Sequence, residues 1–576
     1  VLFRSTYSAP GQYLLCYEAF CFDANWNLLY GCKECDTINV DCGSDEFCMR
    51  IEKKNDPDRG NSIAITKDKE YLVAGTMYED GENGDRDMYI VKFKPDFSQE
   101  FYLKLGDYHG INYSEEGYSV VAVGDAYFVA GTVNLGGEDD DIFVVKLRSD
   151  GSYTWGFRYG DKPGSVERCS KMIDMDSPGI DALLLVGSIL NSDGNFDALA
   201  MMIDPVTGAI MKQKAYYKTT KDNEIARDVV KSGVTSTTDE YVIVGDHVYE
   251  GDYNILTMRI NTSLDLLTPG VIYSVPFMEE HANAVTANDG TVYVTGSSRD
   301  PSPNTDIFLL ELDGGNLSMY NNVHMSSLSS SMDESANGIF MDRDGKLVIT
   351  GETAEPGSPH LTDGLIIKLD PRDKFKFDWS GPRYTNVPDA IERFTEALQA
   401  DADFYLVTGS YGTTTPNDED VYLGKFKTDG TNCCTVDYPM YQQSMVYDVD
   451  ELEKSYEPKL KKNPHGEKKP YIKVEFICGS IDPVRLDNSS GGIASQLLVM
   501  PNPSTGVFTV LLKDESESIQ KIKITDLTGR VLLSEKTTAP NMNSVVFDGS
   551  SLSTGMYVVE VSGSTRKWTT KISITR

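Results

Sequence analysis

A short apolar run that ends in glycine recurs seven times along the chain. Each run is about five residues long and rich in β-branched and aromatic side chains, which predicts a buried β-strand closed by a turn. Successive glycines lie 56, 56, 58, 51, 55 and 58 residues apart. The runs are YLVAG, YFVAG, LLLVG, YVIVG, VYVTG, LVITG and YLVTG, and they end at Gly75, Gly131, Gly187, Gly245, Gly296, Gly351 and Gly409.

Three more strands are expected in each repeat. One begins just after an acidic residue and precedes the glycine run, and another opens nine to twelve residues after the glycine. A more variable outer strand follows turns such as Ser149 to Gly151. Seven repeats of four strands over 58–439, with no helical periodicity between them, predict an all-β fold with a seven-bladed β-propeller.

The short segments VAGT, DMYIVKF and DG carry a resemblance to a known family. In these segments the repeats resemble the bacterial seven-bladed propeller repeats of the SBBP type, and the resemblance covers about two-thirds of the chain. The resemblance implies that the loops before the first and third strands of every blade lie on one face of a ring.

Residues 1–57 form a cysteine-rich segment, with six of the ten cysteines between Cys16 and Cys48. This density predicts disulfides in an oxidising compartment, and Cys433 and Cys434 are further candidates for pairing with the segment. Cys32 and Cys35 could alternatively be a redox pair or half of a zinc site. Residues 19–35 are similar to the last two strands of a repeat, so they either close the seventh blade or belong to an eighth. The start of the chain lacks an initiator Met, so we expect the true start, with a signal peptide, to lie upstream.

The chain changes character after the repeats. Residues 440–496 are expected to be a linker with one strand from Tyr471 to Cys478, and residues 497–576 alternate apolar strands with turns, which predicts a small β-sandwich. The turn residues are Pro501, Asn502, Pro503 and Gly506, then Asp526, Gly529 and Arg530, then Gly555 and Tyr557.

In this order the turns and strands resemble the C-terminal sorting domain of the type IX secretion system of Bacteroidota. The resemblance implies a secreted or outer-surface protein whose partner is the type IX translocon. The alternative is an ordinary immunoglobulin-like accessory module.

The net charge of −35 argues against binding to nucleic acid or to anionic lipid. No run approaches the length of about 20 apolar residues that a membrane-spanning helix needs. Neither GxSxG, HExxH nor GxxxxGK[ST] occurs, and the six histidines are scattered, so the sequence predicts no enzyme.

Two rings of acidic residues are the candidate ligand- or cation-binding positions. Carboxylates that converge on one opening could coordinate Ca²⁺ or attract cationic ligands. The favoured alternative is that they accept hydrogen bonds from loop amides in every blade. The first ring is Asp58, Glu116, Glu167, Glu224, Glu280, Glu334 and Glu392, and the second is Asp87, Asp141, Asp197, Asp306, Asp363 and Asp420, with Asn254 in the fourth repeat.

Specific binding is expected where the blades differ, in the acidic loops Tyr78 to Arg86, Gly136 to Asp140 and Asp300 to Thr305. Asp23 to Asn27 with Glu34 is similar to part of an EF-hand loop, but Leu28 stands where that loop requires glycine. A hairpin turn is therefore expected there, and no cofactor or metal is assigned.

These features predict a binding or adhesion protein whose propeller face contacts an unknown glycan or protein ligand. The alternatives are an accessory or truncated part of a secreted hydrolase and a structural component of an extracellular assembly.

Overall fold

The computed structural model divides into two compact units, Val1–Val484 and Arg485–Arg576, and each is described by itself. Among the described residues the elements are β-strands and one short 3-10 turn, Pro371–Asp373. None of the helical structure described there is long and apolar enough for a membrane crossing. The structure describes residues 20–22, 28–31, 39–41, 47–51, 58–79, 85–107, 113–137, 139–161, 164–234, 239–300, 304–327, 332–354, 362–379, 383–385, 390–413, 419–430, 435–437, 440–443, 445–446, 448–452, 454–456, 461–464, 472–476, 497–500, 507–512, 519, 521–525, 531–536, 544–548, 552–553, 555–562 and 567–574.

Most of the first unit consists of antiparallel groups of strands, which we call modules 1 to 7. Modules 1 to 3 are β5 (Arg59–Ile65), β6 (Tyr71–Glu79), β7 (Asp85–Phe93) and β8 (Gln99–Asp107); β9 (Ser114–Val123), β10 (Ala126–Asn134), β11 (Asp140–Arg148) and β12 (Tyr153–Gly160); and β13 (Glu167–Asp174), β14 (Leu183–Leu190), β15 (Phe196–Ile203) and β16 (Ile210–Tyr217). Modules 4 and 5 are β17 (Asn223–Lys231), β18 (Glu240–Tyr249), β19 (Asp252–Asn261) and β20 (Gly270–Ser274); and β21 (Glu279–Asn288), β22 (Thr291–Asp300), β23 (Asn304–Asp313) and β24 (Met319–Ser327). Modules 6 and 7 are β25 (Asp333–Met341), β26 (Leu347–Ala354) and β27 (Thr362–Asp370), with the short β28 (Lys376–Phe377) and β29 (Arg383–Thr385); and β30 (Ala390–Asp401), β31 (Phe404–Thr413) and β32 (Glu419–Lys427).

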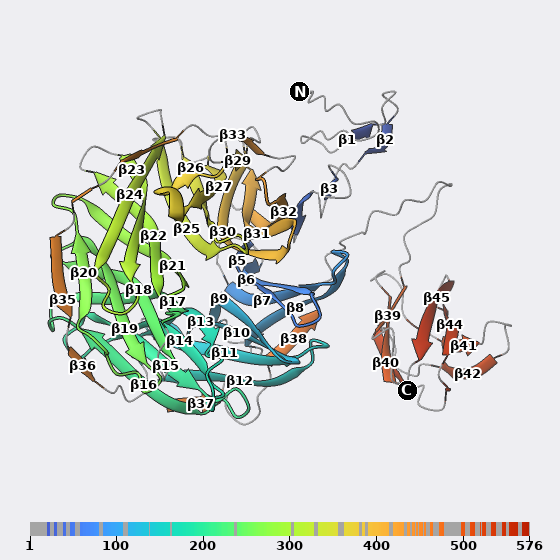
Figure 1. The fold of residues 1–576 in the computed structure, drawn as a ribbon. Coiled ribbons are helices and arrows are strands. Elements are labelled where there is room, and N and C mark those ends of the chain that lie inside the picture. Colours follow the sequence, from blue (N-terminus) through green and yellow to red (C-terminus); the bar gives the residue numbers. More distant parts are fainter. Residues whose placement is uncertain are drawn as a thin grey trace. The chain divides into compact units, whose positions relative to one another are not determined.

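The modules follow one another around a common centre, which gives the first unit a propeller-like arrangement (Figure 1). The first strands contact one another in the cycle β5, β9, β13, β17, β21, β25, β30 and back to β5. Modules 6 and 7 are joined into one sheet by a single parallel residue pair, Thr362 with Ile391.

Seven apolar clusters fill the spaces between successive modules, including the space between modules 7 and 1. Each sheet therefore buries both faces, which explains why β10 has seven consecutive buried residues rather than an alternating pattern. A fully buried Val, Leu, Ile or Phe contributes about 1.5–3 kcal/mol, so these clusters hold the modules together.

The glycine that ends each apolar run allows the first strand to approach closely. A Cβ on Gly131 would lie 1.8 Å from the carbonyl oxygen of Glu116, and a Cβ on Gly409 would lie 1.8 Å from that of Arg393. The remaining five glycines of the series would place a Cβ 1.8 or 1.9 Å from the matching carbonyl. The recurring glycine is thus a steric requirement of the pairing between the first two strands of a module.

The segment after module 7 runs back around the outside of modules 6 to 1, and we call it the belt. Its strands pair antiparallel with the outer strands β29, β24, β20, β16, β12 and β8 in that order. Figure 1 shows several of them at the periphery, coloured orange. The belt strands are β33 (Thr435–Asp437), β34 (Met440–Gln443), β35 (Asp448–Leu452), β36 (Lys454–Tyr456), β37 (Lys461–Pro464) and β38 (Ile472–Phe476).

The belt differs from the expected linker over 440–496. Only β38 lies where the sequence predicts a strand, between Tyr471 and Cys478. The outer edge of each module supplies unpaired N–H and C=O groups, so a segment with little apolar character still forms strands by pairing there.

The fourth strand of module 7 comes from the N-terminal segment. β4 (Phe47–Ile51) pairs antiparallel with β32 and, on its other edge, with β3 (Asn39–Asp41). Residues 19–35 do not supply this strand, since their described part forms the hairpin of β1 (Phe20–Phe22) and β2 (Leu28–Gly31). The side chains of the expected disulfides lie outside the described residues, and Cys169, which the sequence did not single out, is a buried free thiol.

The second unit contains a three-stranded and a four-stranded sheet. Their described apolar residues form one cluster that includes Val510 from the first sheet and Tyr557 from the second. The Tyr557 hydroxyl donates to the carbonyl oxygen of Ser553 at 2.7 Å. The strands are β39 (Leu497–Met500), β40 (Val507–Leu512) and β43 (Ser544–Asp548), and β42 (Val531–Lys536), β41 (Lys521–Thr525), β44 (Gly555–Ser562) and β45 (Lys567–Ile574).

Candidate functional site

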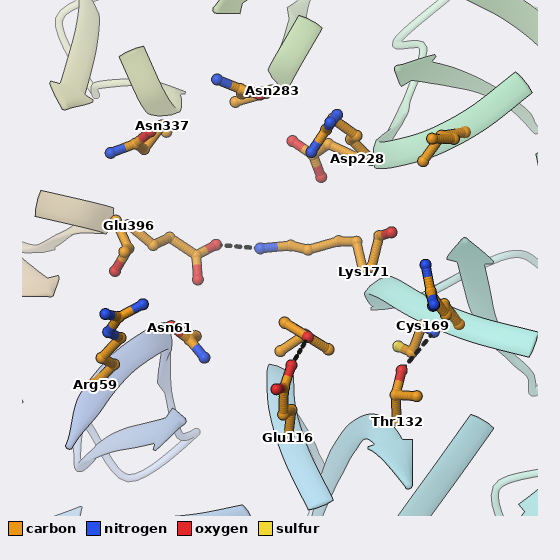
Figure 2. A pocket seen from close by; sticks show the side chains of 18 of the residues that line it. Arg59, Asn61, Glu116, Thr132, Cys169, Lys171, Asp228, Asn283, Asn337 and Glu396 are labelled. Atoms are coloured by element: carbon orange, nitrogen blue, oxygen red, sulfur yellow. Dashed lines mark hydrogen bonds and ion pairs between the residues drawn. The ribbon is translucent and has the colours of Figure 1, made fainter. Parts of the chain in front are cut away.

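A cavity of about 990 Å³ lies where the seven first strands meet. Every one of these strands contributes to its lining, and residues from neighbouring strands complete the wall. Figure 2 shows labelled side chains from several of these strands arranged around the cavity. This volume is at the upper end of the range of about 300–1,000 Å³ that small-molecule sites occupy.

Each first strand carries a β-bulge at the same place, opposite the recurring glycine. A bulge inserts one extra residue and can redirect its side chain. Here all seven bulge residues line the cavity. They are Asn61, Tyr118, Ser170, Arg227, Asn283, Asn337 and Thr395.

In four modules the bulge side chain binds the next module. The amide nitrogens of Asn61, Asn283 and Asn337 donate to the backbone carbonyls of Gly117, Ala336 and Phe394 at 2.7, 2.8 and 3.0 Å. The Thr395 hydroxyl donates to the Gly60 carbonyl at 2.6 Å, which links module 7 to module 1. We call modules 5, 6, 7 and 1 the linked side of the cavity.

The bulge residues of modules 2, 3 and 4 differ, and we call these modules the variable side. The Tyr118 hydroxyl donates to Glu116 in its own strand, and Arg227 pairs with Asp246 at 2.5 Å. Ser170 is the third residue of this set. Tyr118 and Arg227 are therefore directed to carboxylates rather than to the neighbouring backbone.

Lys171 and Glu396 extend toward each other across the middle of the cavity and form an ion pair (Figure 2). The other oxygen of the Glu396 carboxylate accepts from the amide of Ile63 at 3.0 Å. Burial by itself would lower the pKa of Lys171, but the charges of Glu396 and Asp228 outweigh it and raise that pKa. Burial raises the pKa of Asp228 to about 6, although the Lys171 ammonium opposes that rise. Asp228 thus completes a central group of three charges.

Arginine–carboxylate pairs surround this central group. Arg168 pairs with Asp140 at 2.9 Å, and Arg393 pairs with Glu352 at 2.8 Å. Arg86 pairs with Glu116. The cavity wall therefore presents hydrogen-bond donors and acceptors side by side.

The first predicted acidic ring lies beside the cavity rather than in its wall, with one exception. Asp58, Glu167, Glu224, Glu280, Glu334 and Glu392 are at most 1% exposed. Glu116 instead lines the cavity, and the equivalent buried position in module 2 belongs to Glu115, which the sequence did not single out.

The buried carboxyls accept hydrogen bonds from nearby backbone and side-chain groups. Glu280 accepts from the amide of Val275 at 3.2 Å, and Glu167 accepts from the hydroxyl of Ser165 at 2.9 Å. Burial raises the pKa of Glu167 and of Glu280 to about 8. Asp58 accepts from the amide of Tyr78 at 3.2 Å.

The second predicted ring lies on the third strand of each module, two strands away from the first. Its members are buried or half-buried, and several have partners from their own module. Asp87 pairs with Lys104 at 2.6 Å, and Asp197 accepts from Asn191 at 2.8 Å. Burial raises the pKa of Asp141 to about 6. Asp306, Asp363 and Asp420 occupy the matching positions on β23, β27 and β32.

The sequence did not single out the bulge residues, although a signal exists. Each lies three residues after the buried acid of its module, and its identity varies between modules. Of the three variable loops, Tyr78 to Arg86 contributes Arg86 to the lining and Gly136 to Asp140 contributes Asp140, whereas no lining residue comes from the described part of Asp300 to Thr305.

Tyr118 and Glu116, in the described cavity wall, combine a hydroxyl group with a neighbouring carboxylate base. Their hydrogen bond places a hydroxyl on a carboxylate. Burial raises the pKa of Tyr118 to about 12, whereas activation of a nucleophile calls for a lowered pKa. The raised pKa does not favour Tyr118 as an activated nucleophile.

The C-terminal residues match a family model. Residues 498–575 match the model described as the secretion system C-terminal sorting domain. The sorting domain directs export by type IX secretion to the cell surface or the extracellular space. Tyr557 of the predicted motif is buried, Gly555 opens β44, and Pro501, Asn502, Pro503, Gly506, Asp526, Gly529 and Arg530 lie outside the described residues.

Comparison with curated proteins gives no match. Among solved structures, a protein of unknown function from Dyadobacter fermentans DSM 18053 is 10% identical, with a TM-score of 0.38 over 68% of this chain and 98% of that chain. A point mutant of the NanB sialidase from Streptococcus pneumoniae is 8% identical, with a TM-score of 0.38 over 66% of this chain and 70% of that chain. The endosialidase of phage phi92 is 11% identical, with a TM-score of 0.37 over 81% and 85%. Similarity at this level carries no inference about activity.

Proposed function

We propose that this exported protein is a non-enzymatic binding or adhesion protein and that its central cavity takes part of a glycan. The carrying observation is that seven bulge residues of five kinds line one cavity. A scaffold repeated in this way keeps the backbone constant while the recognition residues vary, as in other sites built on rigid elements.

The chemistry of the lining favours a hydroxyl-rich ligand. Sugar hydroxyls both donate and accept hydrogen bonds, and the arginine–carboxylate pairs offer both kinds of partner. The lining includes six cationic side chains and five carboxylates, so it is nearly balanced in a chain whose net charge is −35. A simple anion would have to compete with the carboxylates that already bind the arginines.

We also propose that modules 1 to 7 are the seven blades of a closed β-propeller. The cycle of first-strand contacts and the seven inter-module clusters support this number. β4 would then close the ring by completing the last blade. The two sheets around one apolar cluster support a β-sandwich for the sorting domain.

A glycan array with the purified full chain tests the binding proposal, with and without Ca²⁺. Arg168→Ala should weaken the best binder at least about tenfold, which corresponds to about 1.4 kcal/mol, because it removes a donor from the variable side. Arg372→Ala is the matched control, since Arg372 is an exposed arginine paired with Asp370 outside the cavity. Equal binding by both variants would place the glycan elsewhere, and release of a hydrolysis product would favour a secreted hydrolase instead.

A further inference from the structure

Three potential metal ligands lie together at one end of module 4, outside the cavity lining. Asp222 immediately precedes β17, Glu224 lies in β17 and His247 lies in β18. One ligand atom from each residue lies within 4.8 Å of the other two. The Nε2 atom of His247 is 3.1 Å from Asp222 Oδ2 and 3.8 Å from Glu224 Oε1.

All three residues are removed from solvent. Asp222 is 2% exposed, Glu224 is 0% and His247 is 3%. Within the described part of the chain, Glu224 Oε2 has no hydrogen-bond partner, on the carboxylate whose other oxygen lies 3.8 Å from His247 Nε2. Buried polar atoms in folded proteins nearly always have a partner, so this cluster calls for one more group.

Module 4 departs from the other modules at this place. In the strand register the first-strand acid faces a second-strand residue, which in turn faces a third-strand residue. In module 4 these are Glu224, His247 and Asn254. The second-strand residues of the other modules are Met77, Val133, Ile189, Ser298, Thr353 and Tyr411, and their third-strand residues are all aspartates.

The residue two positions before the acid also differs. Modules 1 and 4 have a carboxylate there in the sequence, Asp56 and Asp222, whereas the other modules have Tyr113, Ser165, Met278, Met332 and Ala390. Module 4 thus gains an imidazole and a second carboxylate beside an acid position that the modules share. A need common to all modules does not explain the imidazole of His247, which only module 4 has at this position.

We propose that Asp222, Glu224 and His247 bind one divalent transition-metal ion, with Zn²⁺ as the preferred ion. Imidazole nitrogen with two carboxylates is a donor set that suits Zn²⁺, and the two carboxylates balance its charge. Tetrahedral Zn²⁺ with bonds of about 2.0–2.1 Å places its ligand atoms about 3.3 Å apart, between the two distances measured from His247. Ca²⁺ prefers six to eight oxygen ligands, which this set does not provide.

Neighbouring groups orient two of the ligands. The Thr219 hydroxyl donates to Asp222 Oδ1 at 2.8 Å, and the Lys218 amide donates to Glu224 Oε1 at 3.0 Å. The Lys218 ammonium is held by Asp450 of the belt. Such contacts fix ligand geometry around metals, and the ion would tie the loop before β17 to the first two strands of module 4.

Elemental analysis of the tag-free full chain tests this proposal. The protein is stripped with EDTA, dialysed against Zn²⁺, Mn²⁺ or Ca²⁺ and then separated from free metal. One Zn²⁺ per chain is expected, with binding at least about 100-fold weaker in His247→Gln and in Glu224→Gln, since each loses one of three ligands. The matched controls are His281→Gln, which alters a histidine beside Asp246, and Glu280→Gln, which alters the equivalent acid of module 5; both should bind as the parent does.

X-ray absorption of the zinc-loaded protein distinguishes this site from the cysteines. One imidazole nitrogen with carboxylate oxygens is expected, whereas sulfur ligands would overturn the assignment. No stoichiometric Zn²⁺, or equal binding by the parent and His247→Gln, would also overturn it. If His247→Gln does not fold, as judged by circular dichroism in EDTA, Asp222→Asn replaces it in the comparison.

Discussion

The linked and variable sides of the cavity share one backbone device and use it differently. On the linked side Asn61, Asn283, Asn337 and Thr395 bind a carbonyl of the next module. On the variable side Tyr118 and Arg227 contact carboxylates. The difference teaches that the same bulge position can either join neighbouring modules or place a side chain against a carboxylate at the cavity.

The largest expected effect comes from the ion pair that spans both sides. Lys171→Met leaves Glu396 and Asp228 without their cation, and we expect a loss of about 3 kcal/mol of unfolding free energy, at the low end for a buried pair because the lysine is partly exposed. Lys214→Met is the control, since Lys214 is similarly covered but its partner Asp265 is exposed. Urea unfolding measures both, and equal losses would show that the central pair has no special role.

Asn337→Leu should produce the next largest effect. It removes the bond to the Phe394 carbonyl and leaves that acceptor unsatisfied, which costs about 2 kcal/mol. Ser170→Ala, at the same bulge position on the variable side, should change stability by less than about 0.5 kcal/mol. Thermal and urea unfolding of the two variants compare the sides directly. If Ser170→Ala is as costly as Asn337→Leu, the distinction between the sides fails.

The smallest effect should be the same on both sides. Burial raises the pKa of Glu167 and of Glu280 from 4.5 to about 8, so their stabilising contribution is complete below about pH 4.5 and is lost as the pH rises through about 8. Glu167→Gln and Glu280→Gln should each reduce the fall in stability between about pH 6 and about pH 9 by about 1 kcal/mol. Asp150→Asn, at an exposed turn, should leave that fall unchanged. If the two glutamate variants differ strongly in this fall, the buried acids also differ between the linked and variable sides.

The strands of the modules were predictable because a sheet that is buried on both faces requires continuous runs of apolar residues in the sequence. The sequence could not show that Glu115, rather than Glu116, takes the buried position of module 2. Two consecutive glutamates precede the bulge, and only the strand pairing decides which of them is buried and which lines the cavity. The belt was missed for another reason. Strand β35 reads DVDEL and buries only Leu452, so its pairing with β20 leaves little hydrophobic pattern to detect.

The site was less predictable than the fold. The bulge residues follow no single pattern: three of the seven are Asn, whereas Asn61 and Tyr118 share neither size nor chemistry. The cluster of Asp222, Glu224 and His247 joins residues whose proximity follows from strand register, which places Glu224 opposite His247. Two acidic positions of each module carried recurring signals, and the first of them marked the buried neighbour of the cavity wall.

The belt has a consequence for how the chain can fold. Along the chain, the belt strands pair with the modules in reverse order, from module 6 back to module 1. The outer edge of β8 in module 1 therefore pairs with β38, which lies more than three hundred residues further along the chain. Closing such long loops is slow, and until the belt arrives the outer edges of modules 1 to 6 remain open templates for pairing with other chains. The outer edges of the modules are therefore all paired only after β38 has been synthesised. In the sequence this strand lies shortly before the sorting domain that directs export.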